Sequence, residues 1–437
     1  MSSDDPARTD TERALTGHRD LLVTFGRIGL LSFGGPAGQI ALMHRILVTE
    51  KGWLSESRFL HALNFCMVLP GPEAMQLATY AGWLKAGWMG GLIGGLLFVL
   101  PGFVILCALS ALYIFLGDVP VVEGVFHGLS AAVLALVAEA LVRLSKRALK
   151  GAVPVMIAFT SFLAIAFLKV PFPLIVLSAA IAGCLLLRRH AGDSEDDEDA
   201  GVPAWPQSLL AIAVWGTAWM VPLVLLLLAL PGSVFSGMAL FFSKAAVVTF
   251  GGAYAVLAYV GQQAVEVHGW LSARDMVTGL GLAETTPGPL ILVLVFVGFA
   301  GGSHLAGIGP FAGGMAGAVT ALWFTFAPCF LWILAGAPFM ERLRQVAWLS
   351  AALSGVTAAV VGVIANLALW FGLHVIFGKV EPVAWGPFEL ALPALSTVDV
   401  TAGVLVTGSA IALLSLRWPV AVVLASACVL GIGIRAL

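Results

Sequence analysis

The chain has 437 residues, of which 60% are hydrophobic and only 11% are charged. A mean hydropathy of +1.01 excludes a soluble globular domain and indicates an all-α polytopic membrane protein with the lipid bilayer as its solvent. The formal net charge of −2 gives no reason to expect a nucleic-acid partner.

Residues 1–19 are polar, lack the apolar core of a cleavable signal peptide, and are predicted to form a cytoplasmic N-terminal tail. Apolar runs long enough to span a bilayer follow one another from there. We expect about 13 transmembrane segments. They lie near residues 20–47, 57–83, 86–116, 119–142, 151–168, 171–188, 207–230, 233–262, 273–300, 304–336, 341–376, 396–416 and 418–436.

An acidic stretch interrupts this series and divides the chain. Its run of carboxylates at 193–199 is typical of a solvated loop, and prolines follow it. We therefore predict an acidic linker at 189–206, between a first transporter repeat at 20–188 and a second at 207–437.

The two halves carry the same motifs. The pattern SFGG…GWLS…PGP at 32–72 recurs as TFGG…GWLS…PGP at 249–289, with Phe33 and Phe250 lying 217 residues apart. A single repeat at half the chain length in an apolar context is typical of a transporter with two-fold pseudosymmetry. An odd number of apolar runs separates the two starts, which predicts two homologous, inverted halves.

Helix-breaking residues lie in the middle of both FGG segments. In lipid, such breaks survive only where protein or a water-filled cavity satisfies the freed backbone groups. A half-helix that begins there offers free N–H groups and a positive dipole end, and nearby hydroxyls add donors. We therefore predict an anion site at these breaks, made by Ser32, Phe33, Gly34, Gly35, Thr249, Phe250, Gly251 and Gly252, with Pro36 as a helix-breaking residue.

Two cations precede the breaks at equivalent positions. Arg27 and Lys244 are 217 residues apart and lie five residues before Ser32 and Thr249. An ionisable residue within a spanning segment is a functional candidate by default, so both are predicted to attract and bind the substrate. The alternative is that both side chains reach the membrane surface from a helix end.

The PGP triplets cannot continue a helix, so each predicts two half-helices or a hairpin in place of one straight segment. Polar residues cluster around them, and Gln76 is assigned to the substrate site. The residues assigned to helix breaking and gating are Pro70, Gly71 and Pro72 in the first half and Pro287, Gly288 and Pro289 in the second.

Two carboxylates flank the PGP triplets and are predicted to couple transport to protons. Glu73 follows its triplet, where the dipole of a half-helix favours the charged form. Glu284 precedes its triplet, where the dipole disfavours the charged form, which makes Glu284 the better proton carrier. The alternative is that both side chains are structural caps.

The GWLS segments are predicted to be architectural, with Ser55 and Ser272 as helix N-caps and Asp275 completing a capping box. Glycines at a spacing of four residues predict helix-packing faces, at Gly87, Gly91 and Gly95 and again at Gly309, Gly313 and Gly317. Basic residues from Arg143 to Lys150 predict a cytoplasmic loop and an N-terminus on the same side. Among the charged residues of that region, Glu139 and Arg143 are expected to form a local ion pair.

No phosphate-binding loop, metalloprotease motif or Cys/His cluster is visible, so we expect no enzyme activity, no metal and no cofactor. The motifs SFGGP, PGPEAMQLATYAGW, TFGGAYAVLAYV, GWLS and GLAETTPGPL closely resemble those of the chromate ion transporter (CHR) family in its long two-domain form, over about residues 20–435. The resemblance extends to Tyr80. It differs at Ala253 and Leu290, where the first half has Pro36 and Glu73, so the halves are not functionally equal.

That resemblance implies a bacterial inner-membrane protein that exports chromate from the cytoplasm, uses the proton-motive force and confers chromate resistance. An inside-negative potential favours anion export by about 2.3 kcal/mol per charge per 100 mV. We expect alternating access around a central site, with protons as a partner and a homodimer as a candidate assembly. The alternatives are a transporter or antiporter of sulfate or another tetrahedral oxyanion, an anion channel, and a membrane enzyme.

Overall fold

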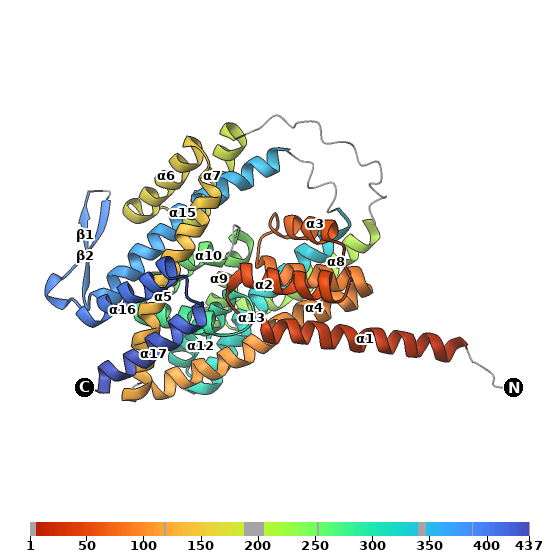
Figure 1. Ribbon diagram of the computed structural model, residues 1–437, viewed down its shortest axis with the longest axis horizontal. Helices are drawn as coiled ribbons and strands as arrows, with labels where there is room; N and C mark the ends of the chain where they lie inside the picture. The colour runs from red at the N-terminus through yellow and green to blue at the C-terminus, as the bar shows by residue number, and fades with distance from the viewer. Residues whose placement is uncertain are drawn as a thin grey trace.

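The computed structural model describes residues 6–117, 119–187, 205–250, 253–339, 347–386 and 388–436. Most of the predicted acidic linker lies outside these ranges. The described chain is helical, apart from an antiparallel hairpin of β1 (Val380–Trp385) and β2 (Phe388–Pro393) that pairs Val380 with Pro393. This hairpin projects from the end of the molecule opposite the N-terminus (Figure 1). Sequence analysis predicted an all-α protein and did not predict this hairpin.

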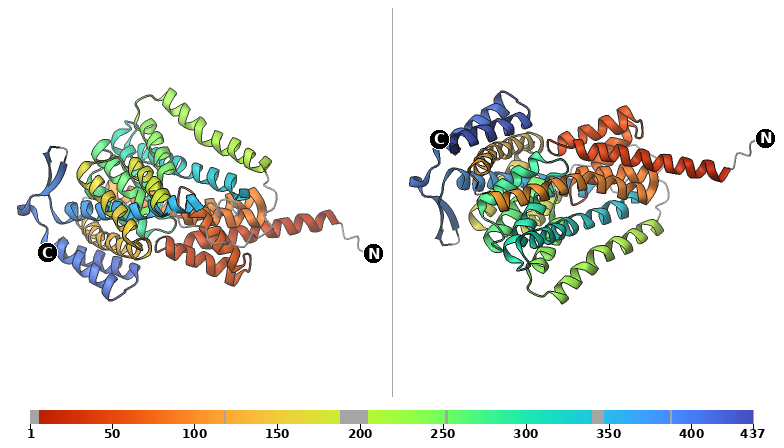
Figure 2. Two further views of the ribbon diagram at one scale, coloured as in Figure 1. Left: turned by 90° about the horizontal axis from the view of Figure 1, so that it is seen from above. Right: turned by 90° about the horizontal axis from the view of Figure 1, so that it is seen from below.

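Five helices among the described residues are long and apolar enough to cross a membrane, and shorter apolar helices accompany them, so the chain is a polytopic membrane protein. The long ones are α4 (Glu73–Leu116), α5 (Pro120–Ala148), α8 (Trp205–Ala229), α13 (Pro310–Gly336) and α15 (Ala347–Ile376). Figure 2 shows α8, in lime green, at the edge of the helix bundle.

The first apolar run is a hairpin instead of one crossing helix. α1 (Pro6–Leu31) ends before the FGG break, and α2 (Gly35–His44) and the π-helical turn η1 (Arg45–Glu50) run back along it. The return is fixed by two ion pairs, from Arg27 to Glu50 at 2.7 Å and from Lys51 to Asp20 at 2.6 Å. The positive φ of Gly34, 83°, makes the reversal possible without strain.

The second apolar run of the sequence also folds back, so that its last residues lie beside the segment just before its first. α3 (Glu56–Cys66) begins with Ser55 as its N-cap, and α4 begins after the PGP turn. The Nζ atom of Lys85, at the end of the first arm of α4, lies 5.3 Å from the ring centroid of Trp53, just before α3. Non-helical dihedrals at Ala86 and Gly87 then reverse α4 into a second, antiparallel arm at 88–116.

The second half repeats these elements. They are α9 (Val234–Val248), α10 (Ala253–Gly261), η2 (Gln262–Val267), α11 (Ala273–Thr285), η3 (Leu290–Leu292) and α12 (Val293–Leu305). Several equivalent elements start 217 residues apart, for example η1 and η2. A Cβ on Gly301 in α12 would lie 2.9 Å from the Cβ of Trp270, so α11 and α12 also return to one end.

The last helices of each half pack on the other half. α6 (Ala152–Leu168) and α7 (Phe172–Leu186) pack against α15, whereas α16 (Val400–Ala410) and α17 (Val420–Ala436) pack against α5 (Figure 1). Small residues make these contacts close, since a Cβ on Gly128 would lie 1.9 Å from the Ala427 carbonyl oxygen. Short turns η4 (Ala337–Phe339), η5 (Leu395–Thr397) and η6 (Ile411–Ser415) complete the chain.

Candidate functional site

The helix breaks of the two halves meet in the interior, at a place that we call the central junction (Ser32, Gly71, Thr249 and Gly288). The Gly71 amide donates to the Thr249 carbonyl oxygen at 2.8 Å, and the Gly288 amide donates to the Ser32 carbonyl oxygen at 2.9 Å. Each bond joins the PGP turn of one half to the FGG break of the other. Donors and acceptors are equivalent residues, so the two bonds are related by the internal repeat.

Glycine is required at both PGP turns for conformational and steric reasons. Gly71 has a φ of 121° and Gly288 a φ of 98°, a region that side chains rarely allow. A Cβ on Gly71 would also lie 2.8 Å from the Cys329 Sγ atom. The neighbouring prolines form the turn that sequence analysis predicted, although their part in gating stays a prediction.

Two glutamines brace the PGP turns, one at each. Gln76 Nε2 donates to the Pro70 carbonyl oxygen and Gln39 Nε2 donates to the Gly288 carbonyl oxygen, both at 2.7 Å. Both side chains are buried, and the Oε1 atom of each lacks a partner in the structure. Sequence reasoning singled out Gln76 but missed Gln39, because its repeat-equivalent is Val256 and it lies between the motifs.

The two hydroxyls at the FGG breaks donate within their own helices. Ser32 Oγ donates to the Ile28 carbonyl oxygen at 2.6 Å, and Thr249 Oγ1 donates to the Ala245 carbonyl oxygen at 2.5 Å. Both residues are fully buried. In this conformation both hydroxyl protons are therefore already donated to backbone carbonyl oxygens. Each hydroxyl has to rotate before it can donate to an anion, as the sequence analysis expects.

The other FGG residues are placed unequally. Phe33 is 49% exposed and Gly34 lies at the reversal before α2, where Gly35 and Pro36 begin the helix. Phe250 is half-buried. The predicted site residues Gly251 and Gly252 lie outside the described residues.

The two predicted cations lie in different surroundings. The side chain of Arg27 is 47% exposed and forms its ion pair with Glu50, which Arg45 also approaches at 3.5 Å. Lys244 is exposed on α9, and no carboxylate of the described residues lies within ion-pair distance of it. The structure therefore neutralises one member of the predicted pair and leaves the other unneutralised.

The two carboxylates occupy the predicted ends of their half-helices. Glu73 is the first residue of α4 and is partly buried, and Glu284 lies in the last turn of α11 with 8% exposure. The Tyr254 hydroxyl donates to Glu284 Oε1. The repeat-equivalent of Glu73 in the second half is Leu290, so that half has no carboxylate after its PGP turn.

The basic end of α5 lies within range of an electrostatic effect on both carboxylates. The charge of Arg143 acts on Glu284, and the charge of Arg147, one turn later, acts on Glu73. Arg143 also forms the expected local ion pair with Glu139, at 3.5 Å. Sequence reasoning placed this end of α5 in a loop and did not connect it with the PGP turns.

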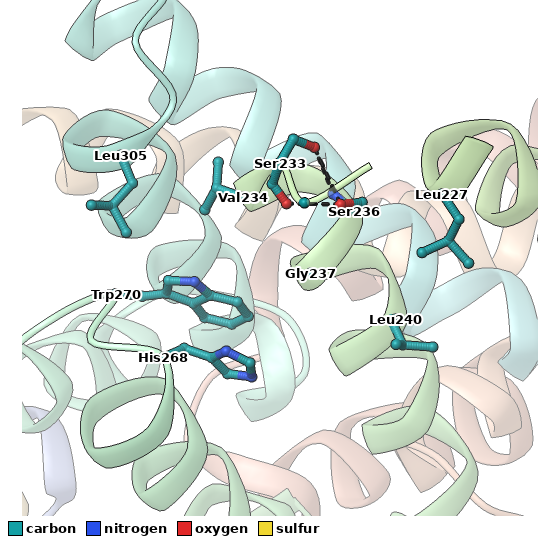
Figure 3. A pocket seen from close by; sticks show the side chains of 10 residues that line it. Leu227, Ser233, Val234, Ser236, Gly237, Leu240, His268, Trp270 and Leu305 are labelled. Atoms are coloured by element: carbon teal, nitrogen blue, oxygen red, sulfur yellow. Dashed lines mark hydrogen bonds between the residues drawn. The ribbon is translucent and has the colours of Figure 1, made fainter. Parts of the chain in front are cut away.

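The two GWLS segments hold the outer ends of their hairpins. Ser55 and Ser272 are N-caps, and Ser272 forms a capping box with Asp275, as predicted. A cavity of about 540 Å³ opens beside the second segment, where the His268 and Trp270 rings stack at 4.5 Å (Figure 3). This cavity lies away from the central junction, so it is not the predicted oxyanion site.

The profile described as "Chromate transporter" matches residues 19–184 and 236–432, which is most of the chain. The chain belongs to the chromate transporter family. It is thus a member of a transporter family and not an enzyme.

Curated relatives of this chromate transporter family member are similar along most of their length. A chromate transport protein of Pseudomonas aeruginosa is 33% identical over 82% of this chain and 82% of its own. A chromate transport protein of Cupriavidus metallidurans is 27% identical over 80% and 82%, and an uncharacterized transporter of Methanocaldococcus jannaschii is 25% identical over 82% and 85%. No solved structure matches the chain.

Proposed function

We propose that this protein exports chromate from the cytoplasm by a secondary active, proton-motive-force-driven alternating-access mechanism. The observation that carries the proposal is the pair of repeat-related hydrogen bonds at the central junction, in a chain whose relatives are named chromate transport proteins. Broken helices whose ends meet at the repeat interface are typical of transporter binding sites.

The groups that we propose to bind the oxyanion belong to the two FGG breaks and the PGP turns. α2 begins at Gly35 and α4 begins at Glu73, so free N–H groups of two half-helices lie next to the breaks. The substrate-binding set that we propose comprises Arg27, Ser32, Phe33, Gly34, Gly35, Gln76, Lys244, Thr249, Phe250, Gly251 and Gly252.

The halves are proposed to be inverted repeats that enter the membrane from opposite sides as re-entrant hairpins. The second arm of α4 starts beside Lys85 and Trp53 and ends where the Tyr113 hydroxyl donates to Asp275 at 2.5 Å. An arm of this length spans about 37 Å, close to the thickness of a bilayer. These contacts support the proposal that the entries to the two pairs of hairpins lie at opposite ends of this arm.

Proton coupling is proposed for Glu73 and Glu284, because both lie beside the PGP turns. Glu284 is also buried and accepts a hydrogen bond from the Tyr254 hydroxyl. The prolines and glycines of both turns, with Pro36, are proposed as the gating hinges. Rocking of one half against the other would then break and remake the two bonds of the central junction.

We propose that the protein lies in the bacterial inner membrane with its N-terminal tail, residues 1–19, in the cytoplasm. The repeats are assigned to 20–188 and 207–437, joined by the acidic linker, and a homodimer is the proposed assembly. A transporter of sulfate or of another tetrahedral oxyanion would use the same architecture, and so would an anion channel. The experiment therefore has to separate these alternatives from chromate export.

The test is uptake of radioactive chromate into everted membrane vesicles. We expect uptake above that of vesicles without the protein, and we expect an uncoupler to abolish it. Uptake that follows the voltage without any proton dependence would contradict coupling and favour a channel. Uptake of sulfate with no uptake of chromate would contradict the substrate.

A further inference from the structure

Each PGP turn holds a buried hydrogen-bond acceptor that has no donor. The Gln39 side chain is 2% exposed and the Gln76 side chain is fully buried, and each uses its Nε2 group on a backbone carbonyl oxygen. Their Oε1 atoms have no hydrogen-bond partner in the part of the chain that the structure describes. A buried acceptor left unpaired is costly, and in a binding site it indicates a ligand that carries a donor.

The charges around the junction favour a ligand with little negative charge. No Lys or Arg is among the buried side chains of the described residues, and the buried carboxyl group is that of Glu284. Arg27 is exposed and paired with Glu50, and Arg143 of α5 is exposed and paired with Glu139. A dianion brought to the junction would therefore have no buried countercharge of its own.

We propose that the central junction recognises a tetrahedral oxyanion in a form that carries a hydroxyl group, with hydrogen chromate as the transported species. The ligand O–H donates to the unpartnered Oε1 atom of Gln39 or Gln76, and the remaining oxygens accept from the free N–H groups of the half-helices. This inference rests on the proposed function and specifies its substrate. Gln39 and Gln76 become specificity-determining residues.

This assignment separates chromate from sulfate by chemistry instead of size. Chromate takes up a proton near neutral pH, whereas sulfate is the anion of a much stronger acid and stays unprotonated there. A site that demands a donor therefore disfavours sulfate, which leaves both acceptors unsatisfied, whereas hydrogen chromate satisfies one of them. Rejection of a ligand that lacks the expected hydrogen bond is stronger than rejection by shape.

The test must be made at a single pH, because several groups near the junction titrate or carry charge. They are Glu73 on α4, Glu284 on α11, Tyr254 on α10, Cys66 on α3, Cys329 on α13, and Glu139, Arg143 and Arg147 on α5. Arsenate and selenate are suitable probes at mildly alkaline pH. Both are tetrahedral dianions of similar size there, but only arsenate retains an O–H group.

We expect arsenate to inhibit chromate uptake into vesicles at about tenfold lower concentration than selenate, as the loss of a hydrogen bond to a buried acceptor predicts. Sulfate should behave like selenate. Equal inhibition by arsenate and selenate would overturn the proposal, because it would show that the site recognises only shape and charge.

Two variants locate the effect. Gln39→Met and Gln76→Met keep the side-chain volume and remove the acceptor, and at least one should bring the ratio of selenate to arsenate inhibition constants close to one. Ser208→Ala is the matched control, because it removes a buried, unpartnered hydroxyl on α8. An unchanged ratio in both glutamine variants would overturn the assignment of the acceptors.

A binding measurement keeps this inference separate from the proposed function. The purified protein should gain thermal stability with arsenate but not with an equal concentration of selenate. Such a preference without chromate uptake would contradict export and support the recognition of a hydroxyl. Chromate uptake with equal stabilisation by both anions would support export and overturn the recognition of a hydroxyl.

Discussion

At the scale of single residues, the repeat is used unequally. Tyr254 and Glu284 form a buried pair in the second half, and their repeat-equivalents in the first half are Ala37 and Met67. Glu73 lies in the first half, where the second has Leu290. Near-symmetric backbone breaks therefore carry asymmetric titratable groups, which is what a transporter needs if one half binds protons differently from the other.

We expect Glu284→Gln to reduce the proton dependence of chromate transport about tenfold or more, because the amide cannot carry a proton yet still accepts from the Tyr254 hydroxyl. The measurement is uptake at several imposed pH gradients. Glu139→Gln is the control, since that carboxylate lies on α5, where it pairs with Arg143, and not at a PGP turn. Full proton dependence in Glu284→Gln would remove this residue as the carrier.

Lys244 is predicted to attract anions more strongly than Arg27, because Glu50 neutralises Arg27 and no described carboxylate pairs with Lys244. Lys244→Ala should lower the uptake rate at low ionic strength several-fold and leave it nearly unchanged at high salt. Lys379→Ala, in the turn before β1, is the matched control. Equal rates for Lys244→Ala and the unmodified protein at low salt would exclude this role.

At the scale of elements, glycine spacing decides how closely helices approach. In α4, Gly87 provides the reversal and Gly91 and Gly95 lie in the interface between helices, and the second half repeats this with Gly309, Gly313 and Gly317. Sequence analysis predicted these glycines as packing faces. The structure adds that the first member of each set is the turn itself.

Gly128→Ala should destabilise the protein by about 1–3 kcal/mol, because the added methyl group meets the Ala427 backbone and forces α5 and α17 apart. Thermal unfolding in detergent, followed by tryptophan fluorescence, measures the loss. Gly403→Ala on α16 is the control, since nothing lies within 4 Å of its Cβ and the helix gains propensity. Similar melting temperatures for both variants would contradict the close packing.

At the scale of the whole molecule, the halves are joined in two ways. The central junction links their breaks, and the exchanged terminal helices place α6 and α7 on α15 and place α16 and α17 on α5. Each half therefore buries part of its helix surface against helices of the other half. Under the proposed alternating-access mechanism, movement between the halves would change the junction, and the exchanged helices would keep their contacts.

The inverted arrangement is tested by labelling. Lys51→Cys and His268→Cys are repeat-equivalent positions at the outer ends of the hairpins, introduced singly into a protein without its native cysteines. An impermeant maleimide should label one of them in intact cells and the other only in everted vesicles. Labelling of both from the same side would contradict inversion.

The sequence by itself determined the polytopic membrane class, the repeat and the positions of the breaks. Apolar composition, and glycine and proline at fixed spacing, act locally, so they can be read without knowledge of contacts. The same reasoning applies to the Ser272 capping box, whose partners lie within one helical turn.

Only the tertiary structure decided which breaks meet, because the bonds of Gly71 and Gly288 join residues far apart in the chain. It also decided that Glu50 neutralises Arg27, that Gln39 reaches a PGP turn in the other half, and that terminal helices are exchanged. Such contacts depend on how elements fold back in space, and no local pattern encodes a partner that lies in another element of the chain.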